Sequence, residues 1–152
     1  MSDTPKLIIG VDPGKTTGLA WLLDDEFTSV DLPPLEACDQ VERLLRRRGD
    51  RPALVAAERY NITQQTVKLS RQYDALEVIG ALRWLAHAHR ATFVLQGASD
   101  AQRCGNREVL RTLGWWSPGG DHRNKAAAQV ALAYQQTFPH EFASRLAPGT
   151  II

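Results

Sequence analysis

Residues 7–18 read LIIGVDPGKTTG, and the architecture of the chain is built outward from this segment. Its first part, 7–11, is continuously apolar and rich in β-branched residues, which is typical of a short buried strand. The run stops at Asp12, and Pro13-Gly14 predicts a turn. A carboxylate at the end of a buried strand costs free energy unless a partner compensates it. Asp12 is therefore a candidate site residue, with a simple turn former as the alternative interpretation.

The remaining pattern predicts an α/β fold. Apolar runs over 18–23 and 27–32 predict two strands that form an antiparallel meander with the first. Further strands are predicted over 53–57 and 92–95, and helices over 35–48, 65–89, 106–113 and 121–134. This order predicts a five-stranded mixed sheet with helices on both faces, in a single domain over 1–152. The tail from Pro139 shows little periodicity, so no element is predicted there.

Composition limits the class of protein. A chain of 152 residues with 43% hydrophobic and 23% charged residues is typical of one globular domain, which excludes disordered and collagenous classes. The net charge of +1 means that any DNA affinity must come from local clusters of basic residues. Cys38 and Cys104 form no metal-binding pattern and suggest reduced thiols. We expect a cytoplasmic protein without a signal peptide or membrane span.

Two further acids stand at element ends. Glu58 follows the predicted strand 53–57, and Asp121 begins the last predicted helix. If the first and fourth strands are parallel neighbours, Asp12 and Glu58 meet, and two like charges at such a distance call for Mg²⁺ or Mn²⁺. The alternatives are a solvent-exposed strand end for Glu58 and a helix N-cap for Asp121.

The same residues carry a family resemblance. The segment 12–18 resembles the opening motif of the RuvC family of Holliday-junction resolvases, and 57–60 (AERY) resembles its second acidic strand end. Residues 114–124 resemble the C-terminal motif of the bacteriophage RuvC-like endonucleases. The three motifs occur in the family's order and span nearly the whole chain.

The resemblance implies a ribonuclease-H-like fold and a metal-dependent endonuclease that resolves four-way junctions or other branched DNA. It also implies a homodimer that nicks two strands, with carboxylates holding two Mg²⁺ ions that activate water. Asp12 and Glu58 match the family's first two ligands, and His122 matches a position that is His or Asp in the family. The candidate catalytic and metal-binding residues are Asp12, Glu58, Asp121 and His122.

Lys125 departs from the family pattern, because it stands where the resemblance implies a further acid. An ammonium group cannot ligate a metal and repels one bound nearby. Three outcomes stay open at this point. Asp121 supplies the missing carboxylate, Lys125 replaces the charge of the second ion, or this chain binds junctions but cleaves them poorly.

Basic residues near the predicted acidic strand ends suggest a phosphate-binding rim, with a solvated scatter of charges as the alternative. Tyr60 and Asn61 fall where the family carries a base-contacting loop, and core packing is the rival interpretation for Tyr60. The candidate DNA-binding residues are Lys15, Arg59, Tyr60, Asn61, Lys68, Arg71, Arg107 and Arg123, with Arg103 and Arg111 on flanking segments.

The long predicted helix also carries an apolar stripe, formed by Leu69, Tyr73, Leu76, Ile79 and Leu82. Gly80-Ala81 permits close approach of another helix, so we expect a homodimer built around this helix, whose two active sites match a substrate with near two-fold symmetry. A different class of function, the actin-like ATPases, shares a phosphate loop similar to residues 10–18. Those enzymes close two such domains over the nucleotide, and this chain shows only one such loop.

Overall fold

The computed structural model describes residues 7–59 and 72–147, and its centre is one mixed sheet with the strand order β3-β2-β1-β4-β5. The strands are β1 (Leu7–Asp12), β2 (Thr17–Leu23), β3 (Glu26–Leu32), β4 (Ala53–Glu58) and β5 (Thr92–Gln96). The first three form the predicted antiparallel meander. β4 lies parallel to β1, and β5 lies parallel to β4. The predicted five-stranded mixed sheet is confirmed.

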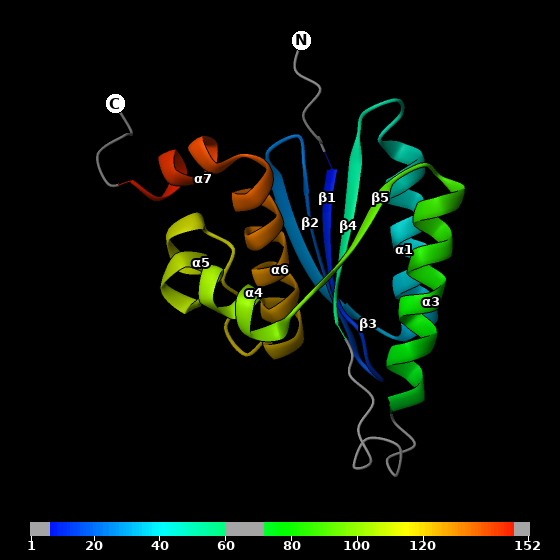
Figure 1. Cartoon of the computed structure of the whole chain (residues 1–152). Helices are drawn as coiled ribbons and strands as arrows, with labels where there is room; N and C mark the ends of the chain where they lie inside the picture. The colour runs from blue at the N-terminus through cyan, green and yellow to red at the C-terminus, as the bar shows by residue number, and fades with distance from the viewer. Residues whose placement is uncertain (1–6, 60–71, 148–152) are drawn as a thin grey trace.

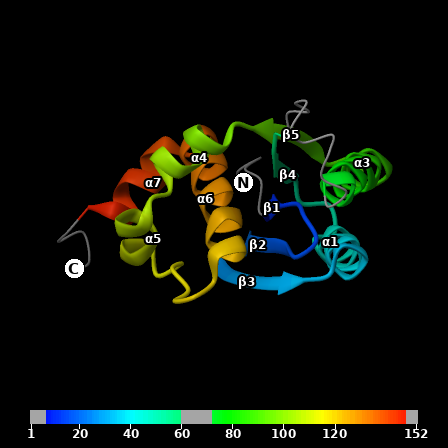
Figure 2. The same cartoon turned by 90° about the horizontal axis from the view of Figure 1, so that it is seen from below.

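Helices cover both faces of this sheet, as predicted (Figures 1 and 2). One face carries α1 (Pro34–Arg47) and α3 (Gln72–Ala88). The other face carries α4 (Ala98–Cys104), α5 (Arg107–Leu113), α6 (Asp121–Thr137) and α7 (Pro139–Leu146). Among the described residues, no helix combines the length and apolar character that a membrane span requires.

Two of these helices were not predicted, and the expectation of an irregular tail from Pro139 is wrong. α4 buries only Ala101 and α7 buries only Phe142. Both helices are short, 7 and 8 residues, and neither begins with a capping side chain, whereas the equally short α5 is marked in the sequence by Asn106 at its start and Gly114 at its end. The Phe142 ring packs edge-on against Tyr134 at 6.0 Å, which fixes α7 against α6.

The alternation of side chains along β1 decides which face carries Asp12. Ile9 and Val11 belong to the core under α1 and α3, whereas Ile8 belongs to the core under α5, α6 and α7. Because successive side chains of a strand point to opposite faces, Asp12 points to the α6 side. The same alternation places Glu58 on that side, because Leu54 of β4 packs in the α6 core.

α6 crosses β1 and β2 at backbone contact. A Cβ atom on Gly10 would lie 2.3 Å from the Ala126 carbonyl oxygen, and one on Gly18 would lie 2.1 Å from the His122 carbonyl oxygen. Only glycine permits such an approach. Since Gly18 pairs with Asp12 across the β1–β2 ladder, this contact brings the first turn of α6 to the end of β1.

The predicted apolar stripe of the long helix needs correction. Leu82 is fully buried in the chain's own core, because α3 directs it, with Val78 and Leu85, onto the sheet. Leu76 and Ile79 are half-buried. Leu69 lies outside the described residues. The sequence analysis did not single out Trp84, which is 63% exposed.

Candidate functional site

Asp12 and Glu58 lie together at the carboxyl ends of two adjacent parallel strands. Val11 of β1 pairs with Ala57 of β4, so the next residue on each strand is the acid. The two carboxyl groups lie close enough for Asp12 to raise the pKa of Glu58. Asp12 is only 6% exposed, so its carboxyl group lies inside the protein rather than in solvent.

The proximity of the two acids changes the protonation of Glu58. Burial raises the pKa of Glu58 to about 7, and the hydrogen bond and negative charge of Asp12 also raise it, whereas the positive charge of Lys125 lowers it. Glu58 therefore keeps its proton to a higher pH than an ordinary glutamate does. The carboxyl oxygens of the pair are also ligands that a divalent cation binds in competition with that proton.

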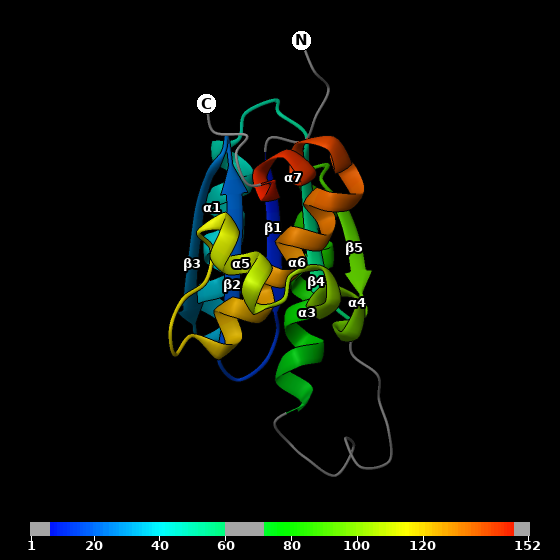
Figure 3. The ribbon, with the colours of Figure 1, turned by 90° about the vertical axis from the view of Figure 1, so that its left-hand side faces the viewer.

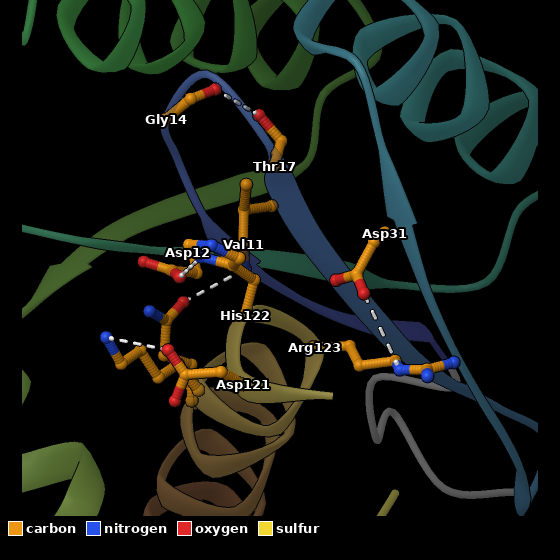
Figure 4. A network of polar contacts seen from close by, with 10 residues as sticks. Val11, Asp12, Gly14, Thr17, Asp31, Asp121, His122 and Arg123 are labelled. Atoms are coloured by element: carbon orange, nitrogen blue, oxygen red, sulfur yellow. Dashed lines mark hydrogen bonds and ion pairs between the residues drawn. The ribbon is translucent and has the colours of Figure 1, made fainter. Parts of the chain in front are cut away.

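His122 contacts the Asp12 member of this pair. Its Nδ1 lies 3.0 Å from Asp12 Oδ2, and Figure 4 shows the two side chains facing each other. The preceding loop is held by Asn124, whose side chain accepts a hydrogen bond from Ser117 N at 2.9 Å and donates one to Ser117 O at 2.8 Å. The backbone contact at Gly18 fixes the other side of this turn of α6.

Asp121 lies at the border of the site rather than inside it. The N-cap of α6 is Gly120, and no side chain caps this end, so the N-cap interpretation of Asp121 is wrong. The Asp121 side chain is 78% exposed, and its Oδ2 lies 3.7 Å from Lys125 Nζ. Lys125 is thus paired with Asp121 while its charge still acts on Glu58.

Two glutamines that the sequence analysis missed hold β1 beneath the site. Gln129 Oε1 accepts a hydrogen bond from Val11 N at 2.9 Å, one residue before Asp12. Gln96 donates from Nε2 to Gln129 O at 3.3 Å and lies opposite Glu58 in the β4–β5 register. The sequence contained a signal for Gln96, because this polar residue ends β5 just as Asp12 and Glu58 end their strands. Gln129 has no comparable signal, since its partner is a backbone amide distant in sequence.

Two of the predicted basic residues follow the acids closely in sequence, and a third lines a cavity at the start of α6. Lys15 is exposed in the turn after Asp12, and Arg59 is exposed directly after Glu58. The Arg107 guanidinium lies over the Trp116 ring at 5.3 Å. Arg107 also lines a cavity of about 490 Å³ together with Asp121 and Lys125, which brings it to the edge of the site.

The other predicted basic residues have partners or lie elsewhere. Arg123 turns toward β3, where its Nε lies 3.7 Å from Asp31 Oδ2 (Figure 4). Arg103 Nη2 lies 2.8 Å from Asp100 Oδ1, and the Arg111 guanidinium lies over Trp116 at 5.9 Å. The candidates that fall outside the described residues are Tyr60, Asn61, Lys68 and Arg71.

The donor atoms fit one hard divalent cation. Within 7–59 and 72–147, no three His, Cys, Asp or Glu residues gather closely enough to form a ready metal site. Asp12 and Glu58 nevertheless offer carboxylate oxygens, which Mg²⁺ and Mn²⁺ prefer, and Mg²⁺ commonly keeps several water ligands beside one or two carboxylates. Lys125 places positive charge where a second ion would need an anionic ligand.

Comparison with known proteins supports the fold. No family model and no curated protein matches the chain in sequence. RuvC from T. thermophilus, solved in complex with a Holliday junction substrate, matches 95% of this chain and 97% of its own at 22% identity, with a TM-score of 0.60. A second Thermus thermophilus RuvC structure matches 92% of this chain and 96% of its own at 22% identity, with a TM-score of 0.56. The chain therefore has the ribonuclease-H-like fold of these RuvC structures.

Proposed function

We propose that the chain is a metal-dependent endonuclease that cuts four-way junctions or other branched DNA. The observation that carries this proposal is the placement of Asp12 and Glu58 next to each other at the ends of adjacent parallel strands. A buried pair of acids serves no evident purpose in packing, because it costs desolvation free energy. The RuvC structure with a Holliday junction substrate, on the same fold, supports branched DNA as the substrate.

The cation in this proposal would be held by Asp12 and Glu58, and it would supply an activated water and a stabilised leaving oxygen. The residues of the chain do the remaining work. His122 Nδ1 holds the Asp12 carboxylate in place, which leaves Nε2 of the ring outside that contact. Because the ring is 45% exposed, Nε2 can accept a proton from a water or ligate an ion.

DNA would lie across the carboxyl ends of the strands, where Lys15, Arg59 and Arg107 supply positive charge. The Trp116 ring restricts the Arg107 side chain, and a restricted side chain loses less conformational entropy when it binds a phosphate. These contacts position the backbone of the DNA without reading its sequence. Binding should therefore weaken steeply as salt concentration rises.

The proposed active species is a homodimer that pairs the outer faces of α3. Leu76, Ile79 and Gly80 lie on this helix, and Trp84 follows Gly80 by one turn. The exposed Trp84 ring is the strongest anchor in this patch, because aromatic residues dominate the binding energy of interfaces. Two sites related by a two-fold axis suit a junction with near two-fold symmetry.

A second candidate function is junction binding with impaired cleavage. The observation that favours it is the charge of Lys125, which reaches Glu58 and opposes a cation there. The salt bridge to Asp121 only partly neutralises this charge, because both side chains are substantially exposed to solvent. The two candidates share the fold, the rim and the dimer, so they differ only in the rate of hydrolysis.

One experiment separates these candidates. End-labelled four-way junction and a linear duplex of the same sequence are incubated with the chain in Mg²⁺, in Mn²⁺ and in EDTA. A nuclease of branched DNA nicks the junction in either metal, leaves the duplex intact and stops in EDTA. Junction binding with no nick in any metal supports the impaired protein, and absence of junction binding contradicts both candidates.

A further inference from the structure

A cavity of about 850 Å³ opens beside Glu58 on the α6 side of the sheet, and the proposed hydrolysis does not use it. At one end lie Arg59, which follows Glu58, and Gln96, which lies opposite Glu58 in the β4–β5 register. From there its lining residues come from β5, α4, α6 and α7, and Figure 3 shows these elements on the same side of the molecule. A ligand in this cavity would therefore reach the strand ends that carry the acids.

The walls combine flat apolar surface with amide groups. The apolar part of the lining consists of Val94, Leu132 and Phe142. The exposed side-chain amides come from Gln135 and Gln136 in the last turns of α6. A nucleobase needs this combination, because its two faces are apolar and its edge carries hydrogen-bond donors and acceptors. A purely hydrophobic ligand would leave the amides without partners.

Gln96 adds an acceptor that the protein itself does not satisfy. The residue is 6% exposed, and its Oε1 is buried without a hydrogen-bond partner among the described residues. Its Nε2 is already used by Gln129 O. A buried acceptor without a donor costs free energy. A shift of the Gln96 side chain that exposes Oε1 to the cavity would let the amine of a nucleobase supply the missing donor.

The charge at the cavity suits a phosphate attached to that base. Arg59 and Arg103 both line the cavity. Arg103 is held by Asp100 at 2.8 Å, whereas the Arg59 side chain is exposed beside the site. A guanidinium group binds phosphate oxygens through paired N–H donors.

We propose that this cavity binds a nucleobase together with its phosphate, and that adenine binds most tightly because glutamine amides pair with it through two hydrogen bonds. Two sources supply this chemistry, a free mononucleotide and a base unstacked from a DNA strand held at Glu58. The second source rests on the proposed nuclease function. Bases at the branch point of a junction are the least costly to unstack, because their stacking is already interrupted.

Cys104 reports occupancy of the cavity, because it lines the wall and is half-buried. Cys38 lies on α1, on the other face of the sheet, and serves as the internal control. Burial raises the pKa of both thiols, so alkylation with N-ethylmaleimide is followed at mildly alkaline pH by mass spectrometry. The added ligands are dAMP, dTMP, inorganic phosphate and a four-way junction, each in a separate reaction.

We expect dAMP at about ten times its Kd to slow alkylation of Cys104 about tenfold, with Cys38 unchanged. Inorganic phosphate alone should leave both rates unchanged, and dTMP should protect less than dAMP. Gln135→Trp and Gln136→Trp fill the cavity and should remove the protection. Thr137→Trp, on an exposed neighbour that does not line the cavity, should retain it.

The outcomes identify the source and test the proposal. Protection by the junction but not by dAMP assigns the cavity to a base of the DNA strand, and protection by dAMP admits free nucleotides. The proposal is overturned if no ligand slows Cys104 relative to Cys38, or if protection persists in both cavity-filling variants. If the chain cuts junctions and no ligand protects Cys104, only the proposed cavity ligand is contradicted. If dAMP protects Cys104 but the chain does not bind junctions, only the nuclease function is contradicted.

Discussion

At the scale of single residues, the site is distinguished by the proximity of Asp12 and Glu58, which raises the pKa of Glu58. Sequence patterns predicted that the two acids would meet, because each ends an apolar strand and the order of elements places those strands side by side. The hydrogen bond of Gln129 to Val11 had no such signal, since it joins a side chain to a backbone amide 118 positions away. The pairing of Lys125 with Asp121 follows from their spacing of one helical turn.

The raised pKa of Glu58, about 7 against an ordinary 4.5, makes stability depend on pH in the metal-free chain. The folded chain holds a proton that the unfolded chain releases, so this contribution is complete below about pH 4.5 and is lost as the pH rises through about 7. Urea unfolding in EDTA should therefore show lower stability at pH 8 than at pH 5. Glu58→Gln should lose this dependence, and the exposed Glu108→Gln should retain it; equal pH dependence in all three chains contradicts the assignment.

Lys125→Asp should bind Mn²⁺ more tightly and nick junctions faster. The change removes a positive charge near Glu58 and adds a carboxylate, and solvent screening reduces the gain from its unscreened value, so we expect about a tenfold or greater increase in affinity. Calorimetric titration with Mn²⁺ measures the affinity without relying on activity. Lys125→Gln, which removes the charge without adding a ligand, should give an intermediate value. Unchanged or weaker Mn²⁺ binding in Lys125→Asp shows that this lysine does not oppose the ion.

At the scale of elements, α6 organises the site because glycine lets it contact the sheet backbone. The sequence predicted all five strands and the longer helices, since their periodicity extends over enough residues. It predicted the short α5 from its end signals, Asn106 and Gly114, and did not predict α4 or α7, which begin without a capping side chain. The boundary of α6 was predicted at Asp121, but the direction of the Asp121 side chain depends on the pairing with Lys125, which competes with capping.

Gly18→Ala should destabilise the fold and slow nicking together. The added methyl group would lie 2.1 Å from the His122 carbonyl oxygen, so α6 must move away from β2 and carry His122 from Asp12. Overpacking of this kind costs about 1–3 kcal/mol. Gly80→Ala is the control for stability alone, because its Cβ meets nothing within 4 Å of the same chain and alanine favours a helix by about 0.5–1 kcal/mol, whereas its nicking rate also depends on the proposed dimer face. Wild-type stability and nicking in Gly18→Ala would contradict the close approach of α6.

At the scale of the whole molecule, the sheet lies between two layers of helices, and only one of these layers covers the face with the two acids. α4 to α7 cover the face toward which Asp12 and Glu58 point, and α1 and α3 cover the other (Figure 2). The layers were predictable from the order of elements. The surface proposed for the dimer followed only in part from the sequence. The burial of Leu82 depends on which side of α3 faces the sheet, and a helix that is apolar on several sides leaves that choice open.

Trp84→Glu should convert the proposed dimer into a monomer. The substitution places a charge in the centre of the apolar patch on α3, where desolvation opposes association. Sedimentation velocity at micromolar concentration measures the state of association. Gln102→Glu adds the same charge at an exposed position of α4 and should leave the dimer intact. A wild-type chain that sediments as a monomer while it still makes paired nicks would contradict the dimer.

The most direct test of whether the carboxylates of Asp12 and Glu58 form the catalytic site is the single-turnover rate of junction nicking in Mg²⁺. This rate is compared between wild type and Asp12→Asn. The asparagine keeps the shape of the side chain but removes the charge that would hold the ion, and loss of several kcal/mol of stabilisation lowers the rate by about a thousandfold. Junction affinity should stay nearly unchanged, and Asp39→Asn on the exposed side of α1 should nick at the wild-type rate. Nicking by Asp12→Asn at the wild-type rate would contradict the account.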